Sequence, residues 1–337
     1  MVVATGRPAA TRGQPRSSAL YTSAVITKPM TVDFQAMVVP ELDTGQVLVK
    51  LQGCGLCASN IPLWEGRDWF HYPLQPGAPG HEGWGVIEAV GPSVAGVAPG
   101  QRVAVLNERA FAEYVVVHSR DAIVIPESLE DLPFPGEPFG CAFNIFARSA
   151  IAEGQVVAII GMGFLGLALV SLAKRRGATV ITLSRRERAL RTASQLGADL
   201  TIKLDEHQRV LDQVNDYTAG AGCERVIECT GMQWPLDLAG NVIKTYGRLV
   251  IAGYHQDGPR QIDLQQWNWK GIDVVNAHER DPDRQRKGIA AALDAIQNGW
   301  LDPRQLLTHA FRFSDMGNAF EQLRSGPQDY VKGYLKF

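Results

Sequence analysis

Three glycines mark the junction between an apolar run and a helical segment in the middle of the chain. The run VVAII is followed by GMGFLG, which contains Gly161, Gly163 and Gly166, and then by LALVSLAKRRG. Gly161 permits a tight turn, Gly163 lets a pyrophosphate approach the backbone, and Gly166 lets helix and strand pack closely. Phe164 and Leu165 then open the helix beside the phosphates. Following a strand and opening a helix, the loop predicts a dinucleotide-binding Rossmann fold rather than an ordinary tight turn.

Apolar runs recur through the second half of the chain. TVITL, LTI, RVIECT, RLVIAG and IDVVN follow VVAII, and helical segments such as 187–196 and 235–244 separate them. Alternating strands and helices predict an α/β domain, with helices on both faces of a parallel sheet. Six strands match a complete doubly wound sheet for a dinucleotide.

The carboxyl ends of these strands should face the cofactor. We therefore expect cofactor contacts from the ends of the fourth and fifth strands, at Cys229, Thr230, Gly253, Tyr254 and His255. Tyr254 and His255 open GYHQDGPR at the nicotinamide end, so they are candidates for substrate contact as well.

The end of the second strand bears on the choice of cofactor. TVITL runs into Ser184, Arg185 and Arg186, where an NAD-specific site would place an acidic residue. A small hydroxyl and two arginines can accept and neutralise a 2′-phosphate, so we expect NADP(H) to be preferred to NAD(H). The alternative is a solvated helix start in which Ser184 only caps the next helix.

The first half of the chain has a different texture. QVLVKLQG, GWGVIEAVG, RVAVL, FAEYVVV and AIVIP are β-branched or alternating, with turn residues between them. They predict an antiparallel, barrel-like β domain. Residues 1–18 contain neither an acidic residue nor an apolar block, so we expect a disordered leader, with an organellar transit peptide as the alternative.

Metal-ligand residue types are scattered through that β domain. Cys54 and Cys57 have CxxC spacing, which suits a redox pair, half of a structural zinc site, or part of a site completed elsewhere. His81-Glu82 follows in PGHEGWG, and PGEPFGC then supplies further candidates in Glu137 and Cys141. Ligands from separate loops are typical of a catalytic zinc site, whereas structural sites use clustered pairs.

These motifs together resemble a known family. GCGLCASN, GHEGWGVIEAVG, FAEYVVV, GEPFGC, GMGFLGLALVSLAKRRGA and VIECTG are similar, in this order, to the zinc-dependent medium-chain dehydrogenase/reductase superfamily, closest to its sorbitol and threonine dehydrogenase type. The resemblance spans about residues 20 to 337. It implies a GroES-like catalytic domain at 19–150, a Rossmann domain at 151–285, a return to the first domain at 286–337, and an active site in the cleft between the domains.

The resemblance also implies a ligand set for one catalytic zinc. CAS matches the family's zinc cysteine at Cys57, which leaves Cys54 as a neighbouring packing residue. EPFG resembles the polyol type's Glu-Pro motif, so Glu137 is preferred to Cys141. The implied metal ligands are Cys57, His81, Glu82 and Glu137, and the hydroxyl of Ser59 is expected to carry the substrate proton.

The chain departs from the family pattern in three places. Only NERA joins RVAVL to FAEYVVV, so the cysteine lobe of a second, structural zinc is missing. Asn60 stands where relatives usually have Asp, and Pro62 stands where many have a proton-relay histidine. The relay route is therefore open, with His71 or a water held by Glu137 as alternatives.

The expected reaction is hydride transfer between NADP(H) and a secondary alcohol or ketone. Polar and aromatic groups near the site favour a polyol, cyclitol, sugar or amino alcohol, and Trp64, Trp69, Phe70, His71 and Tyr72 can line a pocket or pack as ordinary core. The competing readings are a zinc-free quinone or enoyl reductase of the same fold and a non-catalytic NADP-binding protein. Turnover of a substrate panel separates the last of these from an enzyme.

Composition limits the partners. The chain has 33 basic and 35 acidic residues, which argues against a nucleic-acid or membrane-surface protein that binds by charge. Its 5 cysteines are too few and too uneven for a disulfide scaffold, so we expect a reduced, cytoplasmic protein. We expect a small-molecule substrate and assembly into a homodimer or homotetramer.

Overall fold

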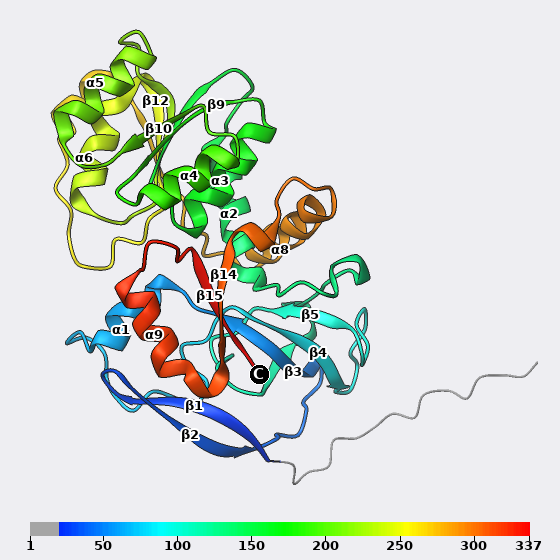
Figure 1. Cartoon of the computed structure of the whole chain (residues 1–337). Coiled ribbons are helices and arrows are strands. Elements are labelled where there is room, and N and C mark those ends of the chain that lie inside the picture. The colour runs from blue at the N-terminus through cyan, green and yellow to red at the C-terminus, as the bar shows by residue number, and fades with distance from the viewer. Residues whose placement is uncertain (1–19) are drawn as a thin grey trace, which may run out of the picture.

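The computed structural model describes residues 20–337 and places two sheets one above the other (Figure 1). The upper sheet has six parallel strands in the order β10-β9-β8-β11-β12-β13. This order reverses direction at β8, as expected for the predicted doubly wound fold. The strands are β8 (Val156–Ile160), β9 (Thr179–Ser184), β10 (Leu200–Lys203), β11 (Cys223–Glu228), β12 (Ile243–Ile251) and β13 (Asp273–Asn276).

Helices between the strands cover the sheet. The first of them, which follows the glycine loop, is buried along nearly its whole length, as its apolar composition predicts. The predicted helices at 187–196 and 235–244 are present, with the second shifted two residues toward the N-terminus. The helices are α3 (Phe164–Arg175), α4 (Glu187–Gln195), α5 (His207–Tyr217), α6 (Gln233–Val242) and α7 (Leu264–Lys270).

The lower body contains the predicted β domain. Its seven-stranded sheet has the order β14-β15-β3-β4-β5-β7, with β6 paired to β3, and a separate hairpin, β1 and β2, covers its underside (Figure 1). The strands are β1 (Leu20–Lys28), β2 (Thr31–Val38), β3 (Gln46–Gly55), β4 (Gly83–Val90), β5 (Arg102–Val105), β6 (Tyr114–His118), β7 (Ala122–Val124), β14 (Leu307–Arg312) and β15 (Lys332–Lys336).

The C-terminal segment returns to the lower body, as the sequence predicts. β15 pairs antiparallel with β3, where Leu335 lies opposite Cys54, and it pairs parallel with β14. Helices α8 (Pro282–Gln297) and α9 (Met316–Ser325) lie in the same segment. Helix α2 (Gly136–Ser149) packs against both α8 and α3 and so joins the two bodies.

Three of the strands were not predicted from the sequence. The strands β1, β2 and β14 were not expected, although β14 alternates between half-buried and exposed residues. Of the two roles left open for Trp64, the structure shows core packing: it is 1% exposed, stacks on Phe320, and donates its indole N–H to Glu321. The predicted leader at 1–18 lies outside the described residues, and the predicted domain boundaries stay predictions.

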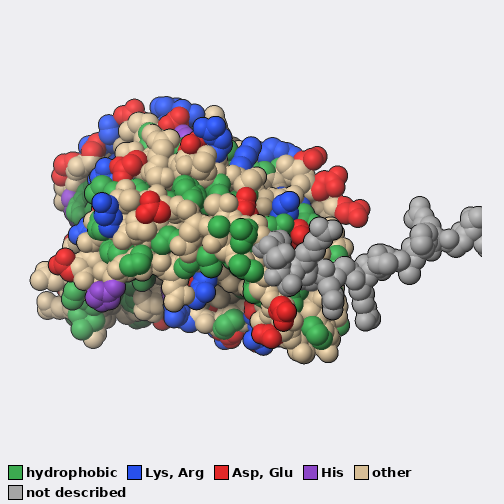
Figure 2. Space-filling model, turned by 90° about the horizontal axis from the view of Figure 1, so that it is seen from below, with side chains coloured by type: hydrophobic (Ala, Val, Ile, Leu, Met, Phe, Trp, Pro, Cys, Tyr) green, Lys and Arg blue, Asp and Glu red, His purple; other side chains and the backbone are tan. Residues whose placement is uncertain are grey.

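The surface of the lower body mixes polar and apolar side chains. Figure 2 views this face from below, with green hydrophobic groups interspersed among charged ones. Within residues 20–337 no helix combines the length and the apolar character needed to cross a bilayer.

Candidate active site

A compact cluster of metal-ligand side chains lies in the lower body. The donor atoms of Cys57, His81 and Glu82 all lie within 4.8 Å of one another. Cys57 ends the loop after β3 and precedes a 3₁₀ turn at Ala58–Asn60, while His81 and Glu82 stand immediately before β4. Because β3 and β4 are antiparallel neighbours, their pairing brings these three residues together.

The ring of His81 is oriented for metal binding. Its Nδ1 donates to the carbonyl of Pro79 at 2.9 Å, which turns Nε2 toward the cluster, 3.9 Å from Glu82 Oε1. Burial lowers the pKa of His81, but the hydrogen bond and charge of Cys57, with the charges of Glu137 and Glu82, outweigh it and raise the pKa to about 10. A second partner that fixes a ring in this way is common for metal-binding histidines.

Glu82 is a buried carboxylate held on one side only. It has 0% exposure, and its Oε1 pairs with the Nζ of Lys332 at 2.5 Å. Its Oε2 has no hydrogen-bond partner in the described part of the chain. A Cβ at Gly55 would lie 1.9 Å from that oxygen, so only glycine leaves room for the carboxylate.

Lys332 is the residue of this site that sequence reasoning missed. It stands in β15, 250 residues from Glu82, and its Nζ also donates to the carbonyl of Leu56 at 3.1 Å and lies 5.3 Å from the ring centre of Phe164. Burial lowers the pKa of Lys332, but the charge of Glu82 outweighs it, so the pKa is raised. The available signal was a lysine inside a strand whose other residues are mostly apolar.

Glu137 and Cys141 share one face of α2, four residues apart. The Cys141 thiol donates to Glu137 Oε1 at 3.0 Å. Burial and the charge of Glu137 raise the pKa of Cys141 well above its ordinary value, so it remains a thiol. The charge of Glu137 acts on His81 and the charge of Cys57 acts on Cys141, but neither Glu137 nor Cys141 belongs to the group of donor atoms that lie within 4.8 Å of one another.

The residues present fit a zinc ion. Thiolate, imidazole and carboxylate are its preferred ligands, and a buried carboxylate oxygen without a partner requires an electrostatic counterpart. Cys54 is separate from the cluster: it is 0% exposed, packs in the core, and donates its Sγ proton to the carbonyl of Gly55.

The residues around Cys57 differ in exposure. Ser59 is half-buried in the 3₁₀ turn, and Pro62 is buried in α1 (Ile61–Glu65). Asn60 is 4% exposed, and its Oδ1 has no hydrogen-bond partner within residues 20–337. His71 is exposed. The structure therefore leaves the proton route as open as the sequence did.

The glycine loop has the close contacts that its sequence predicts. Gly161 has a φ of +101°, a conformation that favours glycine. A Cβ at Gly166 would lie 2.0 Å from the Gly161 carbonyl oxygen, whereas a Cβ at Gly163 would meet no described atom within 4 Å. Gly166 thus serves helix packing, and the open space at Gly163 is where a phosphate can approach. Phe164 and Leu165 open α3 above this loop.

Ser184, Arg185 and Arg186, at the end of β9, differ in their exposure and hydrogen-bond partners. Ser184 is 5% exposed, and its Oγ accepts from the Arg186 backbone N–H at 3.2 Å. The guanidinium of Arg186 donates to the carbonyls of Met162 and Tyr330, so it ties the loop to the C-terminal segment and is not free for a phosphate. Arg185 is exposed, and no ion pair to it occurs among the described residues.

The predicted residues at the nicotinamide end lie at the carboxyl ends of β11 and β12. Thr230 donates its hydroxyl proton to Glu228, and its methyl group faces Gly161. Burial, with the charge of Glu228, raises the pKa of Cys229 well above its ordinary value. Gly253 and His255 also lie against Glu228, a fully buried residue that sequence analysis did not single out.

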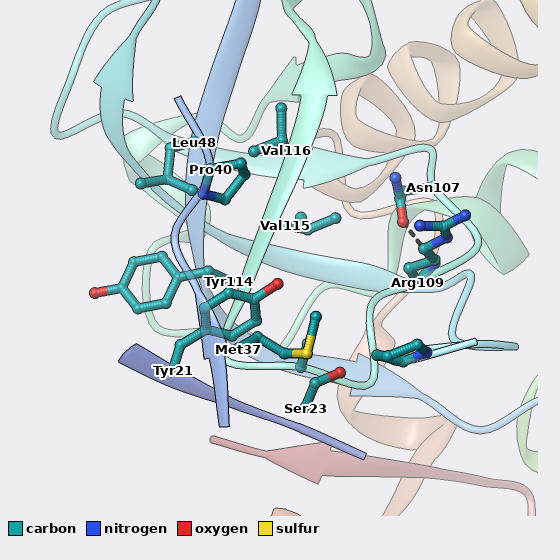
Figure 3. Close-up of a pocket in the computed structure, with 12 residues that line it drawn as sticks. Tyr21, Ser23, Met37, Pro40, Leu48, Asn107, Arg109, Tyr114, Val115 and Val116 are labelled. Carbon is teal, nitrogen blue, oxygen red and sulfur yellow. Dashed lines mark hydrogen bonds between the residues drawn. The ribbon is translucent and has the colours of Figure 1, made fainter. Parts of the chain in front are cut away.

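A separate cavity of about 390 Å³ lies in the lower body, between the β1–β2 hairpin and β6 (Figure 3). Tyr21, Ser23 and Arg109 are among the residues that line it (Figure 3). It contains none of the predicted ligands or cofactor contacts, so it is not the centre of the chemistry.

Two family models match the chain. Residues 43–127 match the alcohol dehydrogenase GroES-like domain, and residues 165–297 match the zinc-binding dehydrogenase domain. The chain therefore belongs to the zinc-dependent medium-chain dehydrogenase/reductase superfamily and is an oxidoreductase of the alcohol dehydrogenase type.

Curated relatives place it in the sorbitol and threonine dehydrogenase-like branch. The chain is 26% identical to the sorbitol dehydrogenase of Halalkalibacterium halodurans, over 90% of this chain and 96% of that protein. It is 27% identical to the L-threonine 3-dehydrogenase of Bacillus subtilis, over 86% and 90%. The crystal structure of an alcohol dehydrogenase from E. coli CFT073, complexed with NADH, shares the fold, with a TM-score of 0.83, 24% identity, and coverage of 94% and 99%.

Proposed function

We propose that the protein is a zinc-dependent dehydrogenase that transfers hydride between NADP(H) and a secondary alcohol or its ketone. The observation that carries this proposal is the cluster of Cys57, His81 and Glu82, with Glu137 on the adjoining helix. These four residues would hold one zinc. The low exposure of the cluster and the family match both support a catalytic rather than a surface metal.

Each residue of the proposed site has its own role in binding or catalysis. A zinc ion, when bound, supplies a Lewis acid for the substrate oxygen, and a nicotinamide, when bound, supplies the hydride partner. Pro79 fixes the His81 ring, and Lys332 holds Glu82 in place while offsetting its charge. We propose that the hydroxyl of Ser59, two residues from Cys57, takes the substrate proton toward solvent.

We favour Glu137 over Cys141 as the fourth ligand. EPFG resembles the polyol type's Glu-Pro motif, and Glu137 presents its carboxylate on the face of α2 that also bears Cys141. Glu137→Gln should therefore lower zinc content and turnover more than Cys141→Ala. The opposite order would make Cys141 the ligand.

The preference for NADP(H) now rests on fewer residues than the sequence suggested. Arg186 is occupied by two backbone carbonyls, which leaves Arg185 as the free cation and Ser184 as a small neighbour without negative charge. The similar E. coli protein holds NADH, but at 24% identity it shares the fold alone. The charge at the end of β9 is what favours the 2′-phosphate.

The substrate class that we propose is a polyol, cyclitol, sugar or amino alcohol. Tyr254 is 63% exposed at the end of β12, and its ring stacks on His278, with centroids 6.0 Å apart. Aromatic faces with polar edges suit hydroxylated molecules better than plain aliphatic alcohols. The named activities of the sorbitol and threonine relatives agree with this choice.

A substrate screen tests the function directly. The zinc-loaded enzyme is assayed with polyols, cyclitols and hydroxy amino acids, each with NADP⁺ and with NAD⁺. We expect turnover of at least one of these classes, which ceases when a chelator removes the zinc and returns when zinc is restored. Turnover of quinones or enones that survives chelation would instead support the zinc-free reductase.

We also propose that the chain assembles into homodimers or homotetramers. β13 is the edge strand of the upper sheet, and Val274 in it is 41% exposed. Trp269 precedes this strand, and Tyr246 lies against Gly271 just before it; they are 89% and 82% exposed. Exposed apolar groups beside an edge strand are typical of an interface. Sedimentation should show a dimer or tetramer that Val274→Lys weakens; a monomer at all concentrations would contradict this.

A further inference from the structure

Three side chains form a continuous hydrogen-bonded chain where β11 and β12 end. Arg260 Nε donates to His255 Nδ1 at 3.0 Å, and His255 Nε2 lies 3.1 Å from Glu228 Oε2. The other end of the arginine is also anchored, because one of its terminal nitrogens donates to the Gly231 carbonyl at 2.7 Å. None of these contacts involves the metal cluster.

The arginine decides where the protons of this chain lie. Arg260 can only donate, so His255 Nδ1 must accept and carries no proton. Nε2 then carries the ring proton and donates it to Glu228. The histidine is therefore held as a single tautomer between a cation and an anion, and each of its two nitrogens has a defined partner.

Glu228 joins this chain to a second loop. Its Oε1 accepts the backbone N–H groups of Thr230 at 2.6 Å and Gly231 at 3.1 Å, besides the Thr230 hydroxyl. The two loops touch through glycines, because a Cβ at Gly253 would lie 2.2 Å from the Gly231 nitrogen. The buried carboxylate thus clamps the loop after β11 to the loop after β12.

The clamp lies beneath an exposed aromatic pair. Tyr254 directly precedes His255, and its ring stacks at 20° on His278, which follows β13. The loop beyond His255 is exposed at Asp257, Gly258 and Pro259. It is attached by this polar chain and, at its far end, by reciprocal hydrogen bonds between Gln261 and Gln233. An exposed loop without such an attachment would open locally at small cost.

We propose that Glu228, His255 and Arg260 are positioning residues that hold the loop 253–261 in register, so that Tyr254 and His278 form a fixed aromatic wall for the substrate. This role rests on the proposed dehydrogenase function, because the wall stands at the carboxyl ends of β12 and β13. Phenol and imidazole edges on a stacked face suit a hydroxylated substrate.

The test compares variants of His255 in the full zinc-loaded enzyme. His255→Leu removes both hydrogen bonds, whereas His255→Gln keeps one acceptor and one donor. We expect His255→Leu to lower kcat/KM for the alcohol about 10- to 100-fold through a misplaced wall. We expect His255→Gln to recover part of that loss and Asp257→Asn to behave as the parent.

Hydrogen–deuterium exchange supplies a readout that needs no activity. The amides of 253–261 should exchange faster in His255→Leu and return toward the parent rate in His255→Gln, while β8 is unchanged. Unchanged exchange and unchanged kcat/KM in His255→Leu would overturn the proposal, as would faster exchange throughout the upper sheet, β8 included. If the parent enzyme oxidises no alcohol, the dehydrogenase assignment fails by itself, and exchange still decides whether the chain holds the loop.

Discussion

The nucleotide loop and the metal cluster are built in opposite ways. The loop and its flanking elements are one stretch of chain, from β8 through α3 to the end of β9. The cluster draws on segments far apart: Cys57 after β3, Glu82 before β4, Glu137 in α2 and Lys332 in β15. The nucleotide loop forms from residues that are neighbours in the chain, whereas the metal site forms only when four distant elements have packed together.

This difference also appears in how each site tolerates substitution. In the loop the critical quantity is space, because a Cβ added at Gly166 would lie 2.0 Å from the backbone carbonyl oxygen of Gly161. In the cluster the critical quantity is charge, because a buried carboxylate, a lysine and an imidazole balance one another at short range. The two regions should therefore fail by different mechanisms.

The largest expected effect separates ligands from their neighbours in the cluster. Cys57→Ser and His81→Ala should lose bound zinc and all measurable alcohol turnover, since each removes a donor atom. Cys54→Ser, three residues from Cys57, is the matched control and should keep both. Loss of metal in Cys54→Ser but not in Cys57→Ser would show that the ligand motif lies three residues upstream.

The next effect tests charge balance in the cluster. Lys332→Met should destabilise the fold by about 3–5 kcal/mol, because it leaves Glu82 buried and unpaired. The double variant Lys332→Met/Glu82→Leu removes both charges and should recover much of that loss. Denaturant unfolding measures both. A single variant as stable as the parent would show that Glu82 does not depend on its lysine.

Substitutions of the loop glycines should change stability less than Lys332→Met does, and their effect should depend strongly on which glycine is replaced. Gly166→Ala should cost about 1–3 kcal/mol, since the new Cβ overlaps the Gly161 carbonyl. Gly163→Ala should leave stability nearly unchanged and weaken cofactor binding instead, because its open space is reserved for the pyrophosphate. Thermal unfolding and cofactor titration separate the two; equal effects from both glycines would contradict this division.

The smallest expected effect concerns the charge at the end of β9. Arg185→Ala should reduce the preference for NADP(H) over NAD(H) about tenfold, the value of one charge-assisted contact. Arg186→Ala should affect stability rather than preference, because its guanidinium binds two carbonyls. The ratio of kcat/KM for the two cofactors measures this. A larger shift from Arg186→Ala would reverse the assignment.

The sequence predicts the upper sheet better than the lower one for a physical reason. Continuous apolar runs such as VVAII are buried on both faces, and their strands appear where expected. β1 and β2 were missed because a hairpin with one face largely in solvent carries only a weak pattern, and β2 has four consecutive exposed residues. Short strands at edges depend on tertiary pairing more than on composition.

The candidate site shows the same limit. The recognised motif residues Cys57, His81 and Glu82 do meet, yet nothing near Lys332 in the chain announces its partner 250 residues away. Likewise, the sequence suggests that Arg186 is a phosphate ligand, but in the folded chain its guanidinium donates to carbonyls of the glycine loop and of the C-terminal segment. The residue type indicates the chemistry that a side chain can perform, but tertiary packing determines which partner it contacts.

Zinc content tests the central claim most directly. The purified protein, expressed with zinc and freed of loosely bound metal, is analysed for metal per chain beside Cys57→Ser. We predict one zinc per chain in the parent and none in the variant, because the chain has one dispersed ligand set and only NERA where a second site's cysteine lobe would lie. No zinc in an active parent enzyme, or two zinc ions per chain, would contradict the account.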